Sequence, residues 1–359
     1  MKNLVQLDKN MIVERTVGDV EVQWLNVREE PFDLYGLYQP KTEPYFHRLP
    51  EAVAKSASPQ VEALSQENAG GRVRFSTDSP FVAIRATYRA VGRSPHLTLV
   101  STAGFDLYID DDFGSRYVRE FRMPYDMDDR YEQLVQVGEK KMRSYTVHFP
   151  IHSVVETLEI GVAPGSEVEK GAAYRPMDPI VIYGSSIVHG TAASRPGLTY
   201  ENVISRSLNM DFLNLGFSGN AKAEIPLAEY IATLPMSAFV FDYDHNAPNA
   251  EFLQQTHYPF YEAFRRLRPD VPLVMISRPN HWTAQPGADC PARRDVVLRS
   301  YLKAREQGDR NVYFIDGMSF FADEEMYDCT MDNLHPNDLG FRKMGNHIAA
   351  VLRHILRGS

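Results

Sequence analysis

Hydrophobic and polar residues alternate in short runs through the first half of the chain. Such a period of two places successive side chains on opposite faces of an extended strand, so each run predicts a strand with one buried face. The clearest runs cover residues 73–75, 81–88, 105–109, 145–149 and 158–162. Several short strands with only one candidate helix, around residues 51–64, predict an antiparallel β-sandwich or jelly roll.

The pattern changes after Pro179. Residues 180–183 form a continuous apolar run, which predicts a strand buried on both faces. Further strands are predicted over residues 211–215, 238–241, 272–276 and 312–315, and helices over 199–208, 224–233, 250–267, 292–307 and 339–356. Strands that alternate with helices predict a parallel sheet covered on both faces, which is a three-layer α/β/α domain.

The change of pattern divides the chain into two predicted domains. A length of 359 residues exceeds the usual size of one domain and suits two. We place the boundary between residues 171 and 178, where neither pattern holds. Residues 1–175 are then an accessory β-sandwich, and residues 176–359 are the α/β domain.

Charge and hydropathy exclude several kinds of partner. The net charge is −9, whereas nucleic-acid binding needs clustered lysine and arginine, so we expect no nucleic-acid partner. No run approaches the ~18 apolar residues of a membrane span, and the first residues lack the apolar core of a signal peptide. We therefore expect no membrane partner and a cytoplasmic protein, or a secreted one if a leader was removed. Cys290 and Cys329 are expected to be unpaired thiols, and the oligomeric state is left open.

Polar residues cluster after the predicted parallel strands. Ser186 follows the first strand, Gly219 the second and Asn246 the third, and Asp332 and His335 precede the last predicted helix. Because ligands of parallel α/β sheets bind at the carboxyl ends of the strands, we expect these residues to lie together.

These clusters resemble the four ordered sequence blocks of the SGNH (GDSL-like) hydrolase superfamily. The matching residues are Gly184-Ser185-Ser186-Ile187, Gly219, Asn246 and Asp332-x-x-His335, and the resemblance extends from about residue 179 to the C-terminus. It implies a flavodoxin-like α/β/α domain with serine hydrolase activity. The first half is similar to the β-sandwich that precedes the SGNH domain in some carbohydrate esterases.

The resemblance implies a role for each of these residues. Ser186 is the nucleophile for an ester carbonyl, and His335 is the base that takes its proton. Asp332 orients His335 as the third member of a triad. The backbone N–H groups of Ser186 and Gly219 and the side-chain amide of Asn246 form the oxyanion hole. This mechanism needs no cofactor and no metal.

Two positions depart from the family pattern. Ser185 stands where an aspartate is usual, and Asn246 is preceded by Asp244 and His245 rather than by the glycine of a Gly-x-Asn-Asp block. We choose Asn246 because its amide can donate to an oxyanion, whereas a carboxylate would repel one.

Each of these residues also has a structural alternative. Ser186 and Asp332 suit helix caps, and Gly219 and Asn246 suit turns. A further set of histidines invites a metal interpretation but matches no zinc motif, so we expect surface or loop histidines there. This set is His189, His245 and His281.

The expected substrate is a short acyl ester, most simply an acetyl ester of a sugar or oligosaccharide, as the resemblance implies. Trp282, in the segment after the fourth strand of the α/β domain, is a candidate for stacking on a sugar ring. The alternatives are a lipid or aryl esterase, a thioesterase, and a non-catalytic carbohydrate-binding protein. The presence of Ser186, His335 and Asp332 together argues against the last.

Overall fold

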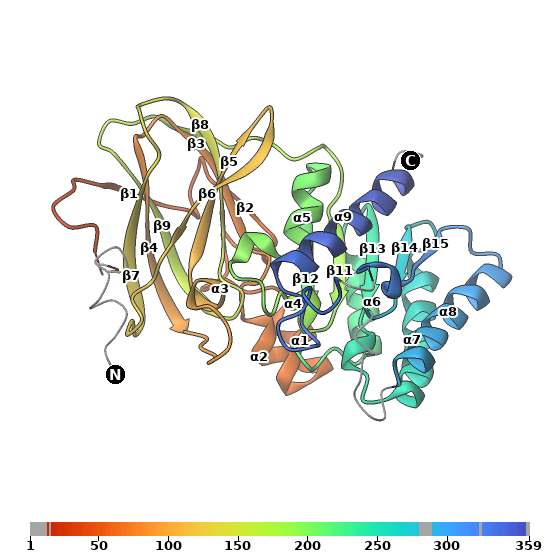
Figure 1. Ribbon diagram of the computed structural model, residues 1–359. Coiled ribbons are helices and arrows are strands. Elements are labelled where there is room, and N and C mark those ends of the chain that lie inside the picture. Colours follow the sequence, from red (N-terminus) through yellow and green to blue (C-terminus); the bar gives the residue numbers. More distant parts are fainter. Residues whose placement is uncertain (1–12, 14–15, 280–288, 323–324, 357–359) are drawn as a thin grey trace.

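The computed structural model describes residues 13, 16–279, 289–322 and 325–356. A β-rich region lies beside an α/β region (Figure 1). The strands of the first region are β1 (Gln23–Asn26), β2 (Asp33–Tyr35), β3 (Arg72–Thr77), β4 (Phe81–Ala90), β5 (Phe105–Asp111), β6 (Gly114–Phe121), β7 (Arg130–Gln136), β8 (Arg143–His148), β9 (Val154–Val162) and β10 (Val168–Lys170).

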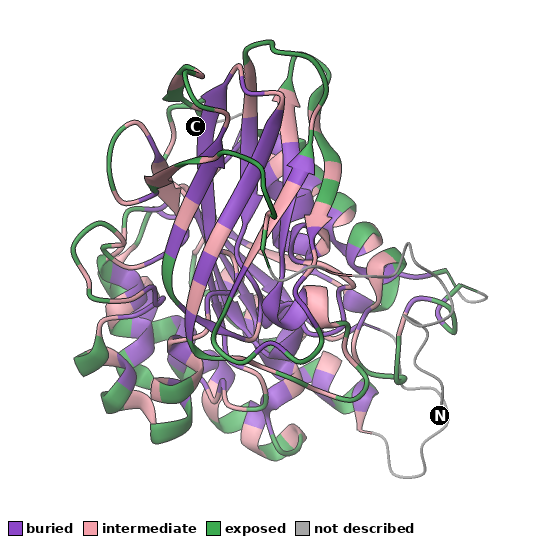
Figure 2. Ribbon diagram, turned by 90° about the vertical axis from the view of Figure 1, so that its left-hand side faces the viewer, coloured by how far each residue is buried: buried purple, intermediate pink, exposed green. Residues whose placement is uncertain are grey.

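These strands form two facing antiparallel sheets. One has the order β1-β9-β4-β7, and the other has the order β10-β3-β8-β5-β6 with β2 paired to β3. Much of the sheet that faces the viewer in Figure 2 is buried, and along β4 buried and partly exposed residues alternate from Ile84 to Tyr88. The buried side chains of both sheets, among them Val82, Ile84 and Phe105, form one core between them. The predicted β-sandwich is confirmed, because each sheet contributes the alternating apolar face that the sequence shows.

The second region is a five-stranded parallel sheet with the order β12-β11-β13-β14-β15. Its strands are β11 (Ile180–Gly184), β12 (Phe212–Gly216), β13 (Ala238–Asp242), β14 (Leu273–Ile276) and β15 (Val312–Ile315). Its helices are α4 (Ser186–His189), η3 (Pro196–Leu198), α5 (Tyr200–Leu208), α6 (Ile225–Thr233), η4 (Asp244–Asn246), α7 (Ala250–Leu267), α8 (Cys290–Glu306), η5 (Gly317–Ser319) and α9 (Asp338–Ile355). This is the predicted flavodoxin-like α/β/α arrangement, with the order reversing beside β11.

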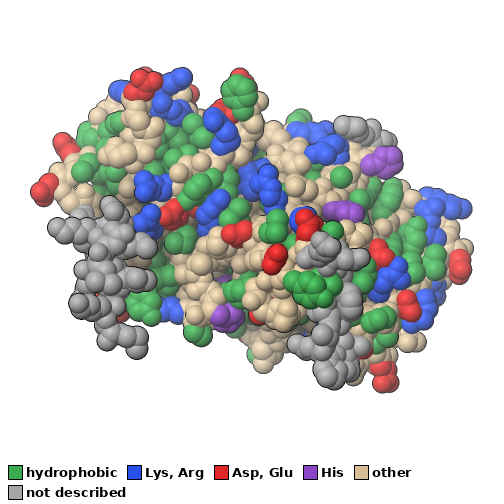
Figure 3. Space-filling model, in the orientation of Figure 1, with side chains coloured by type: hydrophobic (Ala, Val, Ile, Leu, Met, Phe, Trp, Pro, Cys, Tyr) green, Lys and Arg blue, Asp and Glu red, His purple; other side chains and the backbone are tan. Residues whose placement is uncertain are grey.

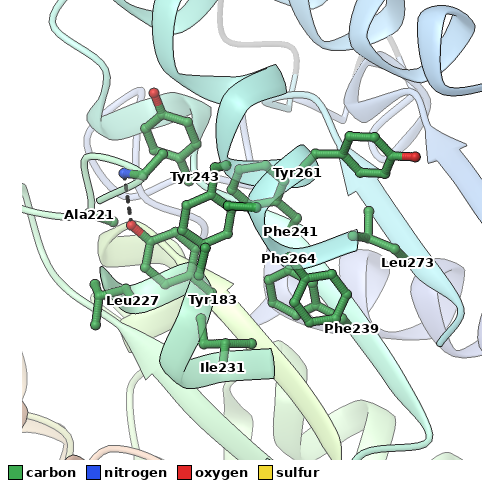
Figure 4. Packing of buried hydrophobic residues seen from close by; sticks show 14 of the residues in the cluster. Tyr183, Ala221, Leu227, Ile231, Phe239, Phe241, Tyr243, Tyr261, Phe264 and Leu273 are labelled. Atoms are coloured by element: carbon green, nitrogen blue, oxygen red, sulfur yellow. Dashed lines mark hydrogen bonds between the residues drawn. The ribbon is translucent and has the colours of Figure 1, made fainter. Parts of the chain in front are cut away.

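Both faces of the parallel sheet are buried. Ile180 and Ile182 of β11 point into the core formed with α5 and α9. Val181 and Tyr183 point into the opposite core, which α6, α7 and α8 cover. Figure 4 shows the aromatic part of this second core, where Tyr183 lies beside Phe241 of β13. The continuous apolar run in the sequence follows directly from this burial on two sides.

Helices α1 (Glu51–Ala57) and α2 (Pro59–Ser65) belong to the first half of the chain but pack on the α/β region. Their side chains Ala54 and Val61 are fully buried in the core beside α6 and α7. The sequence predicts one helix here, and the structure has two because Ser58 caps the second, accepting the N–H of Val61 at 3.1 Å. The first half of the chain therefore completes the core of the second.

A buried arginine strengthens the same junction. Arg48 donates to the carbonyl oxygens of Asn214 at 3.0 Å, Gly216 at 2.9 Å and Leu64 at 2.6 Å. Burial lowers the pKa of Arg48 to about 10, so the guanidinium stays charged at neutral pH. It ties the end of β12 to α2 without leaving that charge uncompensated.

The described surface carries charges of both signs. Basic and acidic side chains are interspersed on the face that Figure 3 shows. Among the described residues, no helix has the length and apolar character needed to cross a membrane. Cys290 and Cys329 are both free and buried.

Candidate active site

The turn after β11 presents Ser186. Gly184 precedes it, and a Cβ at this glycine would lie 1.9 Å from the carbonyl oxygen of Asp242, so only glycine allows this approach of β13. Ser185 caps α4 by accepting the N–H of Ile187 at 3.2 Å, and its own N–H donates to Asp242 at 3.3 Å. Ser185 thus braces the turn where related sequences have aspartate. Ser186 begins α4, so its own N–H has no partner within the helix.

Ser186, His335 and Asp332 lie in one hydrogen-bonded chain. Ser186 Oγ is 2.9 Å from His335 Nε2, and His335 Nδ1 is 2.8 Å from Asp332 Oδ2. The structure therefore brings together three residues that lie up to 149 positions apart in the sequence. Ser186 is 9% exposed, and the Asp332 side chain is 36% exposed. This order of hydroxyl, imidazole and carboxylate is the geometry of a serine nucleophile with its base.

The loop before α9 holds Asp332 in place. Asp332 Oδ1 accepts the backbone N–H groups of His335 at 2.7 Å and Leu334 at 3.1 Å, which leaves Oδ2 for the imidazole. Burial alone would raise the pKa of Asp332, but these bonds to the backbone and ring of His335 hold it below its usual value. The carboxylate is therefore ionised at neutral pH and can stabilise a protonated His335.

The two other predicted oxyanion groups follow β12 and β13 in the chain. Gly219 and Asn246 line the same cavity as Ser186 and His335. Gly219 has a φ of +71°, which favours glycine, and nothing lies within 4 Å of the place a Cβ would take. Asn246 Nδ2 donates one hydrogen to the carbonyl oxygen of Phe217 at 2.8 Å, and the amide carries a second hydrogen. Trp282 and His281 lie outside the described residues, so their predicted roles have no structural counterpart here.

The cavity has a volume of about 700 Å³ and lies between the two domains. Its α/β side includes Ser186, Thr191, Ser218, Gly219, Asn246 and His335. Its other side comes from the β-rich domain and includes Glu67, Arg93, His96, Leu97, Thr102 and His152. This second set is not predicted from the sequence, because no local pattern marks loop residues of a sandwich that face another domain.

Five of the lining and adjacent side chains form what we call the polar ring: Glu67, His152, Thr191, Ser218 and His189. Glu67 Oε2 lies 3.0 Å from His152 Nδ1 and 3.0 Å from His189 Nε2. Burial opposes ionisation of Glu67, but hydrogen bonds from His152 and His189 outweigh it and lower its pKa. His189 is 0% exposed, so the expectation of a surface or loop histidine is wrong for this residue. Burial, aided by the charge of Arg48, lowers its pKa to about 4.

Glu67, His152 and His189 place three possible metal ligands within 4.8 Å of one another. The hydrogen bonds do not suit a metal, however. The Ser218 N–H points at His189 Nδ1 at 3.4 Å, which puts the ring hydrogen on Nε2, the nitrogen that faces Glu67. The buried cation Arg48 also donates to the Glu67 carbonyl oxygen at 2.7 Å and disfavours a further positive charge. The Nε2–H of His189 therefore fits a hydrogen bond to the Glu67 carboxylate.

Two family models together match most of the chain. The GDSL-like Lipase/Acylhydrolase family model matches residues 177–353, which contain Ser186 and His335. The model described as the N-terminus of Esterase_SGNH_hydro-type matches residues 22–168. The chain belongs to the SGNH (GDSL-like) hydrolase superfamily. As an SGNH protein of the esterase and acylhydrolase type, it consists of the β-sandwich and α/β domain that the sequence predicts.

Several solved structures share both domains. A protein assigned as a GDSL-like lipase from Bacteroides ovatus ATCC 8483 is 29% identical, with a TM-score of 0.84, over 94% of this chain and 98% of that chain. The salicylyl-acyltransferase SsfX3 of a tetracycline biosynthetic pathway is 20% identical, with a TM-score of 0.75, over 93% and 98%. The acetyl xylan esterase Est2A of the rumen bacterium Butyrivibrio proteoclasticus is 12% identical, with a TM-score of 0.59, over 93% and 98%. The last two show the common fold alone, and a search of curated proteins found no match.

Proposed function

We propose that this protein is a serine esterase that removes short acyl groups, acetyl above all, from sugars or oligosaccharides. The observation that carries the proposal is the chain of contacts from Ser186 Oγ through His335 to Asp332, at 2.9 Å and 2.8 Å, inside a cavity between two domains. The sugar ester as substrate class is our inference from the family resemblance, and an acetyl xylan esterase is among the proteins that share the fold.

The reaction has two halves. Ser186 Oγ attacks the ester carbonyl carbon while His335 Nε2 takes the hydroxyl proton, and the proton then passes to the leaving alcohol. Water attacks the acyl-enzyme with His335 again as base, and the acid is released with Ser186 restored. In both halves the negative charge on the carbonyl oxygen is held by the N–H groups of Ser186 and Gly219 and by the Asn246 amide.

The cavity supports a bulky polar alcohol as the leaving group. Its walls carry hydroxyl, imidazole, carboxylate and guanidinium groups beside apolar side chains, which are Leu97, Ala247, Pro248 and Leu334. Such groups can exchange hydrogen bonds with sugar hydroxyls at either side of the ester.

The test is acetate release from a panel of acetylated oligosaccharides, with p-nitrophenyl acetate as a general ester and matched thioesters and aryl esters alongside. We expect the highest kcat/KM on one of the sugar acetates. A preference for long-chain, aryl or thioesters would move the assignment to those classes, and no turnover of any ester would favour a carbohydrate-binding role.

A further inference from the structure

The polar ring connects the two domains beside the nucleophile. Thr191 Oγ1 is 3.1 Å from His152 Nε2 and 3.3 Å from Ser218 Oγ, and Ser218 Oγ is 3.0 Å from His189 Nδ1. Glu67 lies between the two imidazoles and closes the ring. Glu67 and His152 come from the first half of the chain, and the other three residues come from the α/β domain.

The α/β members of the ring belong to the two segments that carry the backbone oxyanion donors. His189 is the last residue of α4, whose first residue is Ser186. Ser218 directly precedes Gly219 in the sequence. The contact between Ser218 and His189 therefore sets the distance between the nucleophile turn and the Gly219 loop. The close approach of these segments also needs Gly216, because a Cβ at this position would lie 2.2 Å from the backbone nitrogen of His189.

The N-terminal members of the ring are themselves anchored. Arg48 donates to the Glu67 carbonyl oxygen at 2.7 Å and also to Gly216 at 2.9 Å, so Glu67 is fixed to the strand that leads into the Gly219 loop. The backbone N–H of His152 donates to Thr102 at 3.2 Å, within the sandwich. Both ring nitrogens of each imidazole have partners, which suits residues that hold a geometry rather than transfer protons.

We propose that Glu67 and His152 are positioning residues, through which the N-terminal domain holds the Ser186 and Gly219 N–H groups in oxyanion-binding geometry. The proposal rests on the proposed function of Ser186 as nucleophile. Oxyanion donors act only when they lie about 2.7–3.1 Å from the developing charge, and misplacement by about 1 Å costs much of their effect. A ring that spans both domains keeps these donors in place while the cavity fills with substrate.

The test measures how fast a fluorophosphonate labels Ser186. In this reaction the Ser186 oxygen displaces fluoride from phosphorus, so it needs the nucleophile, base and oxyanion donors but no matched ester. The variants are Glu67→Gln, His152→Gln and the double variant, with Glu62→Gln and His354→Gln as controls of the same type outside the cavity. Labelling rate, kcat and KM for p-nitrophenyl acetate, and the thermal unfolding midpoint are recorded for each.

We expect each single ring variant to be labelled about tenfold more slowly, with kcat reduced by a similar factor and KM changed by less than about threefold. The double variant should lose no more than the worse single variant, because both break the same ring. The controls should be labelled at the wild-type rate. Thr191→Val removes two hydrogen bonds of the polar ring and changes no charged group. It therefore tests the positioning role of the ring if a Glu67 variant does not fold.

Two results would overturn the proposal. One is wild-type labelling in folded ring variants. The other is a loss in the double variant equal to the product of the single losses with KM raised, which would mean separate contacts with substrate. Failure of Ser186 as the nucleophile looks different, because the wild-type protein itself would then not be labelled at Ser186, and a different ester preference would show in the substrate panel while labelling stays intact.

Discussion

Two chains of carboxylate, imidazole and hydroxyl face the same cavity, and they differ in what surrounds the hydroxyl. Asp332 and His335 lead to Ser186, with distances of 2.8 Å and 2.9 Å. Glu67 and His152 lead to Thr191, with distances of 3.0 Å and 3.1 Å. The distances alone do not separate a nucleophile from a structural hydroxyl.

The backbone separates them. Ser186 begins a helix and has an N–H free of helical bonding, beside the Gly219 loop. The N–H of Thr191 donates to the Ser186 carbonyl oxygen at 3.0 Å, and its hydroxyl also contacts Ser218. An ester carbonyl attacked by Thr191 would find no oxyanion donor in that residue. A carboxylate, imidazole and hydroxyl at triad distances therefore form a catalytic site only where oxyanion donors lie next to the hydroxyl.

The sharpest test of this comparison replaces each hydroxyl. Ser186→Ala should fold normally and lose at least about 10⁴-fold in kcat, because no neighbouring group supplies the attacking oxygen. Thr191→Val should lose about tenfold, since it affects only the position of the donors. Hydrolysis of p-nitrophenyl acetate gives both rates, and mass spectrometry of the fluorophosphonate adduct locates the nucleophile. A label on the peptide that contains Thr191 would reverse the assignment.

Replacing the imidazole and carboxylate groups of the two chains should give the next largest differences in kcat. His335→Ala should be as damaging as the loss of Ser186, because triad residues act as a unit. Asp332→Asn should lose less than His335→Ala but far more than the tenfold of Glu67→Gln, because the amide can still accept the backbone N–H groups of the loop but turns an N–H toward His335 Nδ1 and so favours the wrong tautomer. Steady-state kcat values order the three variants. A larger loss in Glu67→Gln than in Asp332→Asn would mean that the second chain carries the chemistry.

The sequence predicts the α/β half of this comparison well and the other half poorly. The strands β11 to β15 and the blocks that follow them are marked by apolar runs and by short polar motifs at strand ends. Asp332 and His335 are three positions apart, so one loop contains them. Glu67 and His152 are 85 positions apart and His189 another 37 beyond, and only the packing of two domains brings them together. The same packing places α1 and α2 in the α/β core, although they belong to the half of the chain for which the sequence predicts a β-sandwich.

The rate of cleavage as a function of acyl-chain length tests the effect of Glu67 in the cavity wall. The pKa of Glu67 lies below its usual value despite burial, because His152 and His189 donate to it, so a charged group lines one wall. A long alkyl chain placed there would remove water from a charge at a cost in free energy. We expect p-nitrophenyl acetate to be cleaved at least about tenfold faster than the octanoate, about 1.4 kcal/mol of barrier. Faster cleavage of the octanoate would instead support a lipid esterase.

A third carboxylate, Asp242, is fully buried and extends the comparison to the effect of pH. Asp242 ends β13 behind the nucleophile turn and is paired in register with Gly184. Burial, with a smaller contribution from Asp244, raises its pKa to about 7, although the Tyr200 hydroxyl donates to it at 3.2 Å. Glu67 has two imidazole donors and a lowered pKa, whereas Asp242 has one phenol and a raised pKa. The partners, and not burial alone, set the charge of each.

The raised pKa predicts how stability changes with pH. Folded Asp242 keeps its proton up to about pH 7, whereas the unfolded chain releases it near its ordinary value of 3.8. Its contribution to stability is therefore complete below that value and is lost as the pH rises through 7.

The side-chain amide introduced by Asp242→Asn has no proton to lose in this range and can still accept from Tyr200. From pH 5.5 to 8.5 the unfolding midpoint of the wild type should fall by about 2–4 °C more than that of the variant. Thermal unfolding at these two pH values decides the matter: other acids that titrate in both proteins cancel in the difference, so parallel midpoints would mean that folded Asp242 is already ionised at pH 5.5.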